Sequence, residues 1–163
     1  LGLSYPGGPE LEKLAREGDA NAFSFRGGFN DGDSLDFSFS GIKTAVVNLM
    51  HNAEQKGEKL NRADIAASFQ RSVVDTLCTK AVRAAKHNGV STLALAGGVS
   101  LNTALRTALE AEAKKAGLRF CRPDMRFCTD NAAMIACAAH YALMEAGPSE
   151  LSLNAQPSKE LAE

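Results

Sequence analysis

Three polar residues in a row, Thr129-Asp130-Asn131, precede an Ala-rich, apolar helix pattern in this chain of 163 residues. One capping side chain is enough to begin a helix, so this stretch carries more polar chemistry than capping requires. A carboxylate at a helix N-terminus is stabilised by the helix dipole, and it is also placed to hold a metal ion or a substrate group. Asp130 is therefore either a structural acid of the first turn or a ligand-binding carboxylate.

A second candidate is the run Leu95–Asn102, in which Gly97-Gly98 follows a short apolar stretch. Glycines at the end of a strand let the backbone approach a ligand closely, and the helix start after them offers free N–H groups to a phosphate or a ribose. Asn102 can donate and accept hydrogen bonds, which suits a purine or ribose edge. A tight strand-to-helix turn with Asn102 as its cap or in solvent explains the same residues.

Two further helix starts could bind a ligand. In Tyr5–Glu12 a glycine pair lies between prolines, and Glu12 falls on the first turn, where it could accept hydrogen bonds from sugar hydroxyls. A surface acid matched to the helix dipole is the alternative. Ser40–Lys43 begins another helix where an anion could dock, although a core strand followed by a surface lysine explains the pattern as well. We expect Phe37 and Phe39 to be buried.

The remaining residues give little indication of a metal-binding site or of a catalytic nucleophile. Cys121, Cys128, Cys137 and His140 could form a zinc site, but the spacing is unusual and the last two lie in a helical pattern. The three histidines are isolated, and none belongs to an H-x-x-x-H or H-E-x-x-H pair. One carboxylate cannot hold a metal ion alone. No spacing supports a Ser or Cys nucleophile with a His.

The elements that must position these residues alternate between helix and strand. The apolar spacing and the turn residues predict helices over 9–18, 41–50, 62–86 and 100–115, and from Asp130 to about 145. They also predict a loop over 26–36, a short strand or extended segment over 36–40, and strands over 92–96 and 118–121. This order indicates a parallel-sheet α/β lobe in which 92–96 is a buried strand, followed by a loose polar tail from Gly147.

Composition limits the class of protein. The chain is 45% apolar and has 18 Lys plus Arg against 19 Asp plus Glu, which excludes a strong nonspecific nucleic-acid field but allows a local basic patch. No apolar run approaches the roughly 20 residues of a membrane span, and no signal peptide is present. We expect a cytoplasmic protein with reduced cysteines. Because the chain begins with Leu1 rather than Met, we also expect it to be a piece of a larger protein.

Four segments, in this order, together resemble the TsaD family of tRNA threonylcarbamoyladenosine transferases, once called Gcp or O-sialoglycoprotein endopeptidase. They are Leu1–Pro9, Asp36–Thr44, Ala96–Asn102 and Cys128–Ala136. The resemblance implies the C-terminal half of the enzyme, with an actin-like ATPase fold (sugar kinase and heat-shock ATPase, RNase H-like). Residues 1–146 would form most of its second lobe and 147–163 the tail.

The resemblance also implies roles for individual residues. Gly8, Glu12 and Asn102 would hold the adenylate part of threonylcarbamoyl-adenylate, Gly97 and Gly98 would form the turn against the nucleotide, and Asp130 would bind the catalytic iron or zinc. The reaction would move the threonylcarbamoyl group to the exocyclic amine of the adenosine next to the tRNA anticodon, with release of AMP. The family's paired metal-binding histidines would lie before Leu1, so this chain would be inactive alone. Leu101 is bulkier than the family's usual small residue.

The expected partners are tRNA and, in the full-length enzyme, TsaB- and TsaE-type proteins, with no membrane; self-association through an exposed lobe face stays open. One alternative is a noncatalytic nucleotide-binding or scaffold paralogue of the same complex, although the intact Thr129–Asn131 argues against it. Another is a different enzyme of the sugar kinase-like fold, which would need a phosphate loop and a catalytic Asp from the first lobe. Nothing resembles a zinc-protease helix.

Overall fold

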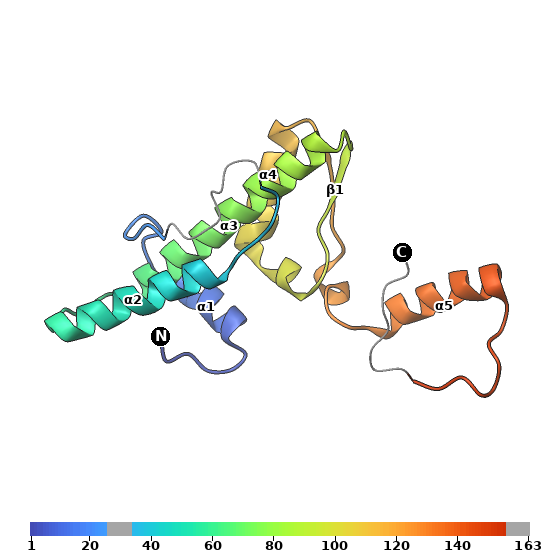
Figure 1. The fold of residues 1–163 in the computed structure, drawn as a ribbon, viewed down its shortest axis with the longest axis horizontal. Helices are drawn as coiled ribbons and strands as arrows, with labels where there is room; N and C mark the ends of the chain where they lie inside the picture. Colours follow the sequence, from blue (N-terminus) through green and yellow to red (C-terminus); the bar gives the residue numbers. More distant parts are fainter. Residues whose placement is uncertain (26–33, 156–163) are drawn as a thin grey trace. The chain divides into compact units, whose positions relative to one another are not determined.

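The computed structural model describes residues 1–25 and 34–155, in which it shows helices and one short parallel strand pair (Figure 1). The elements are α1 (Gly7–Ala15), α2 (Ser40–Lys56), α3 (Arg62–His87), β1 (Thr92–Ala94), η1 (Gly98–Leu101), α4 (Thr103–Lys115), β2 (Arg119–Cys121), η2 (Met125–Phe127) and α5 (Ala132–Ala146). The chain divides into two compact units, Leu1–Cys128 and Thr129–Glu163. Most of the loop predicted over 26–36 lies outside the described residues.

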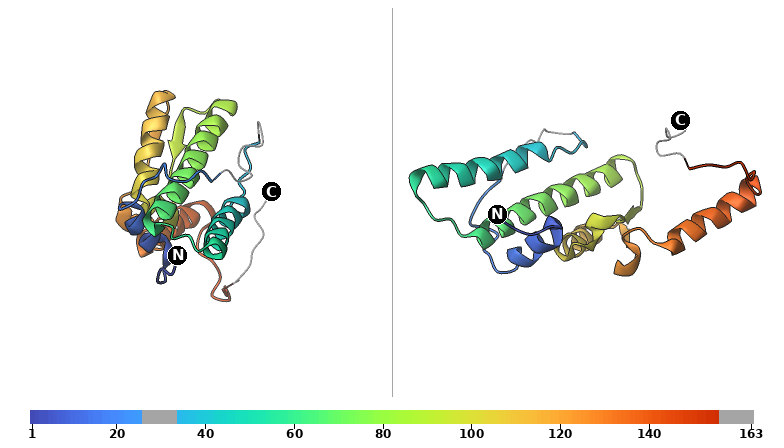
Figure 2. Two further views of the ribbon diagram at one scale, coloured as in Figure 1. Left: turned by 90° about the vertical axis from the view of Figure 1, so that its left-hand side faces the viewer. Right: turned by 90° about the horizontal axis from the view of Figure 1, so that it is seen from below.

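The longest helix, α3, organises the first unit, because α1, α2 and α4 all contact it (Figures 1 and 2). The helix predicted over 62–86 is confirmed. Asn61 caps it by accepting a hydrogen bond from the Ala63 N–H at 2.9 Å, and Asn88 follows its last residue. A single long helix thus supplies the surface against which the site-bearing helices α1 and α4 are held.

Two apolar clusters join these helices. Ile65 of α3 packs with Ile42 of α2 and with Phe25 in the first cluster. Further along α3, Val74 and Cys78 pack with Leu105 and Leu109 of α4 in the second. The four-residue apolar repeat expected along 62–86 therefore faces α2 at one end of α3 and α4 at the other.

The chain packs closely against the start of α3 at Gly18, three residues after the end of α1. A Cβ on Gly18 would come within 2.1 Å of the Ala63 carbonyl oxygen, so no larger residue fits there without a shift of the backbone. The buried Ser68 hydroxyl donates to the Asp19 carbonyl oxygen at 3.2 Å and fixes the same turn. These contacts hold the end of α1, the helix that carries Glu12, against α3.

The α/β class is confirmed by a β1–η1–α4–β2 unit. Its two strands pair in parallel, with Leu93 opposite Phe120, and the Leu95 N–H donates to the Cys121 carbonyl oxygen at 2.9 Å. The burial expected for 92–96 is wrong, because Leu93 is only half-buried and Ala94 is exposed. Helices α3 and α4 contact these strands. A strand is fully buried when helices cover both faces of its sheet, and the two described strands are not covered in that way.

The segment before α2 differs from the sequence prediction. No strand forms over 36–40; Ser40 begins α2, and Phe37 and Phe39 are 47% and 42% exposed rather than buried. The two rings stack on one another instead, 6.1 Å apart. The buried Lys80 of α3 donates to the Asp36 carbonyl oxygen, so a lysine rather than a strand partner holds this segment.

Helix α2 also runs further than expected. It continues through the polar run after His51 to Lys56, and Gly57 ends it with a φ of +68°. Such a left-handed conformation is typical of a glycine that terminates a helix.

The second unit contains α5. The prediction that this helix runs from Asp130 is wrong by two residues: it begins at Ala132, because the Asn131 side chain accepts the Met134 N–H at 3.0 Å and acts as the cap. No residue of α5 is buried, and Ile135 and Met144 are 64% and 72% exposed. The division into a lobe over 1–146 and a tail over 147–163 stays a prediction.

No helix in the described ranges is long and apolar enough to cross a membrane.

Candidate functional site

Four of the five residues expected to bind the nucleotide line one cavity in the first unit. Its volume is about 300 Å³, and it is lined by Gly8, Pro9, Glu12, Gly98, Val99, Leu101 and Asn102. The N-terminal turns of α1 form one wall; η1 and the cap of α4 form the other. Residues some 90 positions apart in the sequence are thus brought together at two helix N-termini. We call this space the glycine cavity.

Glu12 joins the two walls of the glycine cavity. Its Oε1 accepts a hydrogen bond from the Thr103 main-chain N–H at 3.0 Å and another from Arg16 Nη2 at 3.2 Å. Partial burial alone would raise the pKa of this carboxyl, but the hydrogen bonds from Thr103 and Arg16 together outweigh it and lower the pKa. Glu12 is therefore ionised at neutral pH, and its carboxylate, with about four lone-pair sites, can accept further hydrogen bonds.

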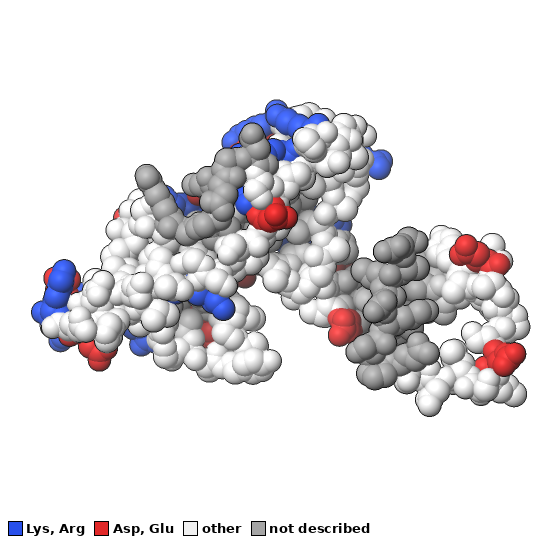
Figure 3. Space-filling view, in the orientation of Figure 1, with Lys and Arg blue, Asp and Glu red and all other residues white. Residues whose placement is uncertain are grey.

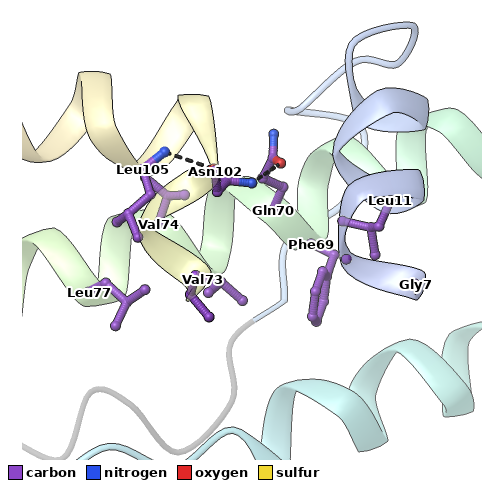
Figure 4. Close-up of a pocket in the computed structure, with 11 residues that line it drawn as sticks. Gly7, Leu11, Phe69, Gln70, Val73, Val74, Leu77, Asn102 and Leu105 are labelled. Carbon is purple, nitrogen blue, oxygen red and sulfur yellow. Dashed lines mark hydrogen bonds between the residues drawn. The ribbon is translucent and has the colours of Figure 1, made fainter. Parts of the chain in front are cut away.

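Asn102 fixes the start of α4. Its Oδ1 accepts the Leu105 N–H at 2.9 Å, and its Nδ2 donates to Gln70 Oε1 of α3 at 2.9 Å (Figure 4). The expectation that a helix begins at Ser100 is corrected by this cap: Gly98–Leu101 forms a 3-10 turn, and α4 starts at Thr103. Asn102 thus has the capping role, and it also lines the cavity.

The glycine pair has two different conformational roles. Gly97 has φ +85° and ψ 171°, a combination that is essentially restricted to glycine. Gly98 has no such constraint, and a Cβ on it would meet no atom within 4 Å. Gly97 therefore sets the direction of the turn, whereas Gly98 leaves space in the cavity beside it.

A second, smaller cavity of about 210 Å³ adjoins the first and shares Gly8, Val99 and Asn102 with it (Figure 4). Its other lining residues are mostly apolar and include Phe69, Val73 and Leu77 from α3. Asn102 and Gln70 are its two lining residues with polar side chains. The pair of cavities offers a polar rim beside an apolar floor, as small-molecule sites commonly do.

Sequence reasoning missed Gln70 and Thr103. Gln70 follows Phe69 on α3 and reads as a solvated helix position, because a single sequence does not show that Asn102 lies opposite it. Thr103 gives Glu12 a main-chain N–H, which any residue could supply, and a side-chain hydrogen bond, but a single sequence does not show that Glu12 lies opposite it. The capping signature at Asn102 could have drawn attention to the N–H groups next to it.

Ser40, Gly41 and Lys43 do not line the glycine cavity. They lie in the first turn of α2, where the exposed Lys43 donates its main-chain N–H to the Phe39 carbonyl oxygen at 3.2 Å. Their expected role as an anion site stays a prediction.

Asp130 belongs to the second unit and is exposed there. It precedes the cap of α5, so it is not the residue that satisfies the first N–H groups of that helix. Among residues 1–25 and 34–155, no three His, Cys, Asp or Glu side chains lie close enough to hold a metal ion. The four cysteines are free; the zinc site considered for Cys121, Cys128, Cys137 and His140 draws on both units and stays a prediction.

Basic side chains gather where α3 and α4 end (Figure 3). Lys86 and His87 lie in the last turn of α3, and Lys114 and Lys115 in the last turn of α4. Cations there complement the helix dipoles. They form the local basic patch that the near-neutral net charge leaves open.

The βαβ unit and the cavity between helix N-termini define the class: an α/β protein with a glycine turn between a strand and a helix. Comparison with known proteins is more specific. The model of the TsaD family, tRNA N6-adenosine threonylcarbamoyltransferase, matches residues 1–137. This chain belongs to that family.

Alignments with curated relatives cover all or nearly all of this chain. A tRNA N6-adenosine threonylcarbamoyltransferase of Moorella thermoacetica is 52% identical over 157 residues, covering 96% of this chain and 46% of its own length. Proteins of the same name from Clostridium perfringens and Clostridium botulinum are 47% and 48% identical, and each alignment covers 100% of this chain and 48% of the relative. The chain spans about half the length of the curated relatives it matches.

Proposed function

We propose that this chain is the C-terminal half of a tRNA N6-adenosine threonylcarbamoyltransferase and that its first unit binds the adenylate part of threonylcarbamoyl-adenylate. The single observation that carries the proposal is the glycine cavity, in which Gly8, Glu12, Gly98 and Asn102 meet. Family membership supports an actin-like ATPase fold for the full-length protein, with this chain in its second lobe. The described α/β unit is compatible with that fold.

Each wall of the cavity suits a part of an adenylate. Glu12 is ionised and its carboxylate can accept further hydrogen bonds, so it can receive them from ribose hydroxyls. The turn at Gly97 and Gly98 carries no side chain that would keep a nucleotide from the backbone.

The proposed reaction is an acyl transfer. The exocyclic nitrogen of the tRNA adenosine attacks the carbamoyl carbon and forms the new C–N bond. The bond from that carbon to the phosphate oxygen breaks, AMP leaves with the electron pair, and the attacking nitrogen loses a proton. The chain's contribution is to hold the AMP portion still while the acyl carbon is attacked, which lowers the entropic part of the barrier.

The metal expected for this family does not fit the described residues by themselves. Iron or zinc in a protein takes three or more protein ligands, and no such group is present among the described side chains. Asp130 would supply one carboxylate, and the other ligands would come from the remainder of the full-length protein. No step of the reaction above is assigned to the metal.

The partners and the compartment are proposed by analogy with the family. We propose tRNA as the acceptor substrate, TsaB- and TsaE-type proteins as partners, and the cytoplasm as the compartment. The basic patch of Lys86, His87, Lys114 and Lys115 supports contact with tRNA phosphates, because cations at a surface bind a nucleic-acid backbone without regard to sequence.

The test uses the full-length protein with synthetic threonylcarbamoyl-adenylate, unmodified tRNA and the partner proteins. Nucleosides from the digested tRNA are measured by mass spectrometry, and we expect threonylcarbamoyladenosine to form. Gly98→Val, which adds a side chain at the wall of the cavity, should abolish the product, whereas Asn48→Val, at an exposed position of α2, serves as the control. AMP binding without transfer by the wild-type protein would favour a noncatalytic scaffold instead.

A further inference from the structure

Arg106 is a buried cation that pairs with no carboxylate of residues 1–25 and 34–155. It lies in the second turn of α4, and it is 5% exposed. Its Nη1 donates to the Ser100 carbonyl oxygen at 3.0 Å and lies 3.4 Å from Cys128 Sγ, and its Nη2 donates to the Pro123 carbonyl oxygen. Burying a guanidinium is costly unless its hydrogen bonds are satisfied, so these acceptors must stay in place around it.

The acceptors belong to two different segments. Ser100 lies in η1, the turn that forms one wall of the glycine cavity. Its buried hydroxyl has no hydrogen-bond partner within the described ranges, its N–H donates to the Gly97 carbonyl oxygen at 3.0 Å, and its own carbonyl oxygen accepts from Arg106. Any movement of η1 on ligand binding is therefore transmitted to the guanidinium.

The other acceptors lie in the segment 123–128, which we call the lead segment because it leads along the chain to Asp130. This segment is a folded turn: the Phe127 N–H donates to the Asp124 carbonyl oxygen at 2.9 Å, and the Cys128 N–H donates to the Met125 carbonyl oxygen at 3.2 Å. Arg106 contacts it at both ends, at Pro123 and at Cys128.

We propose that Arg106 is a positioning residue that couples the glycine cavity to the lead segment. The planar guanidinium presents two nitrogens in a fixed geometry, so a bond to Ser100 and a bond to Pro123 hold the two segments in one register. Occupation of the cavity then orders the attachment point of the chain that carries Asp130. This inference rests on the proposed function, because it takes an adenylate as the ligand of the cavity.

The test is hydrogen–deuterium exchange of the full-length protein with and without saturating AMP. We expect AMP to slow amide exchange in Gly97–Asn102 and, in the wild-type protein, also in the lead segment, by roughly threefold or more. In Arg106→Lys the charge stays, but the second nitrogen that reaches Pro123 is lost. AMP should then still slow exchange in Gly97–Asn102, whereas the lead segment should respond less than about twofold.

The matched control is Arg122→Lys. Arg122 is a partly exposed arginine that pairs with Glu110 of α4, the helix that carries Arg106, at 3.2 Å. It should respond as the wild type does. Where Arg106→Lys does not fold, Arg106→Gln removes the buried charge, keeps one amide donor and carries the same expectation.

The outcomes separate the two claims. Absence of any AMP binding by the wild-type protein would contradict the proposed function. Binding that protects Gly97–Asn102 but not the lead segment would overturn the coupling alone. The coupling through Arg106 would also be overturned if the folded Arg106 variants kept the full response of the lead segment, because a purely structural arginine leaves that response intact.

Discussion

Replacement of Asn102 by alanine tests the most precise feature of the cavity, the cap of α4. The change removes the acceptor of the Leu105 N–H and the donor to Gln70 Oε1, both at 2.9 Å. Loss of an N-cap costs about 1 kcal/mol, and loss of a half-buried hydrogen bond costs about the same. We therefore expect the free energy of unfolding to fall by about 2 kcal/mol.

For a protein of this size, that loss lowers the melting temperature by about 4–8 °C. Differential scanning calorimetry, or urea unfolding followed by circular dichroism, measures it on the purified chain. Asn102→Asp keeps an oxygen for the Leu105 N–H, and the Gln70 amide can turn its NH2 toward the new carboxylate. The aspartate variant should therefore lose less than about half as much stability as the alanine variant.

Asn48→Ala is the control, because Asn48 is exposed within α2 and alanine favours helices. It should change the free energy of unfolding by less than about 0.5 kcal/mol. The reasoning is refuted if Asn102→Ala unfolds like the control, or if the aspartate variant is as unstable as the alanine variant.

Four further predictions concern other residues of the site and metal binding by the chain. Gly97→Ala should destabilise the protein by about 1–3 kcal/mol, because φ +85° with ψ 171° strains any side chain, whereas Gly98→Ala should leave the melting temperature nearly unchanged. Partial burial would raise the pKa of Glu12, but hydrogen bonds from Thr103 and Arg16 lower it, so the charge of Glu12 stabilises the fold above about pH 4.5. This contribution is lost as the pH falls below that value, so the difference in unfolding free energy between wild type and Glu12→Gln, measured by urea unfolding, should shrink there. A difference independent of pH would contradict this prediction. In the full-length enzyme Asp130→Ala should abolish tRNA modification without lowering the melting temperature, while loss of folding would make Asp130 a structural residue. Calorimetry should show only very weak metal binding by this chain alone, and tight stoichiometric binding would disprove that expectation.

The sequence was informative where local patterns determine structure. Ile65, Phe69, Val73 and Leu77 recur every four residues, and the helix they predict is the one observed. The glycine pair after an apolar run correctly marked the end of a strand before a helix, and the parallel pairing followed from the order of elements. Local periodicity and turn residues are sufficient for these features.

The errors came from tertiary partners that a single sequence does not reveal. Phe37 and Phe39 alternate as a strand would, but a buried lysine from α3 holds that segment and leaves the rings exposed. The buried roles of Arg106 and Gln70 were equally invisible, because charged and amide side chains on a helix usually face solvent. The candidate site was found through its glycines and Asn102, whereas the side chain that fixes Asn102 was not.

The most direct test of the adenylate site is photolabelling of the full-length protein with 8-azido-AMP, followed by peptide mapping. We predict that label appears in peptides containing Gly7–Glu12 or Gly97–Thr103 and that unlabelled AMP prevents it. Gly98→Val should lose this labelling while keeping its melting temperature. Label that AMP displaces from other peptides only, or no displaceable label, would contradict the account.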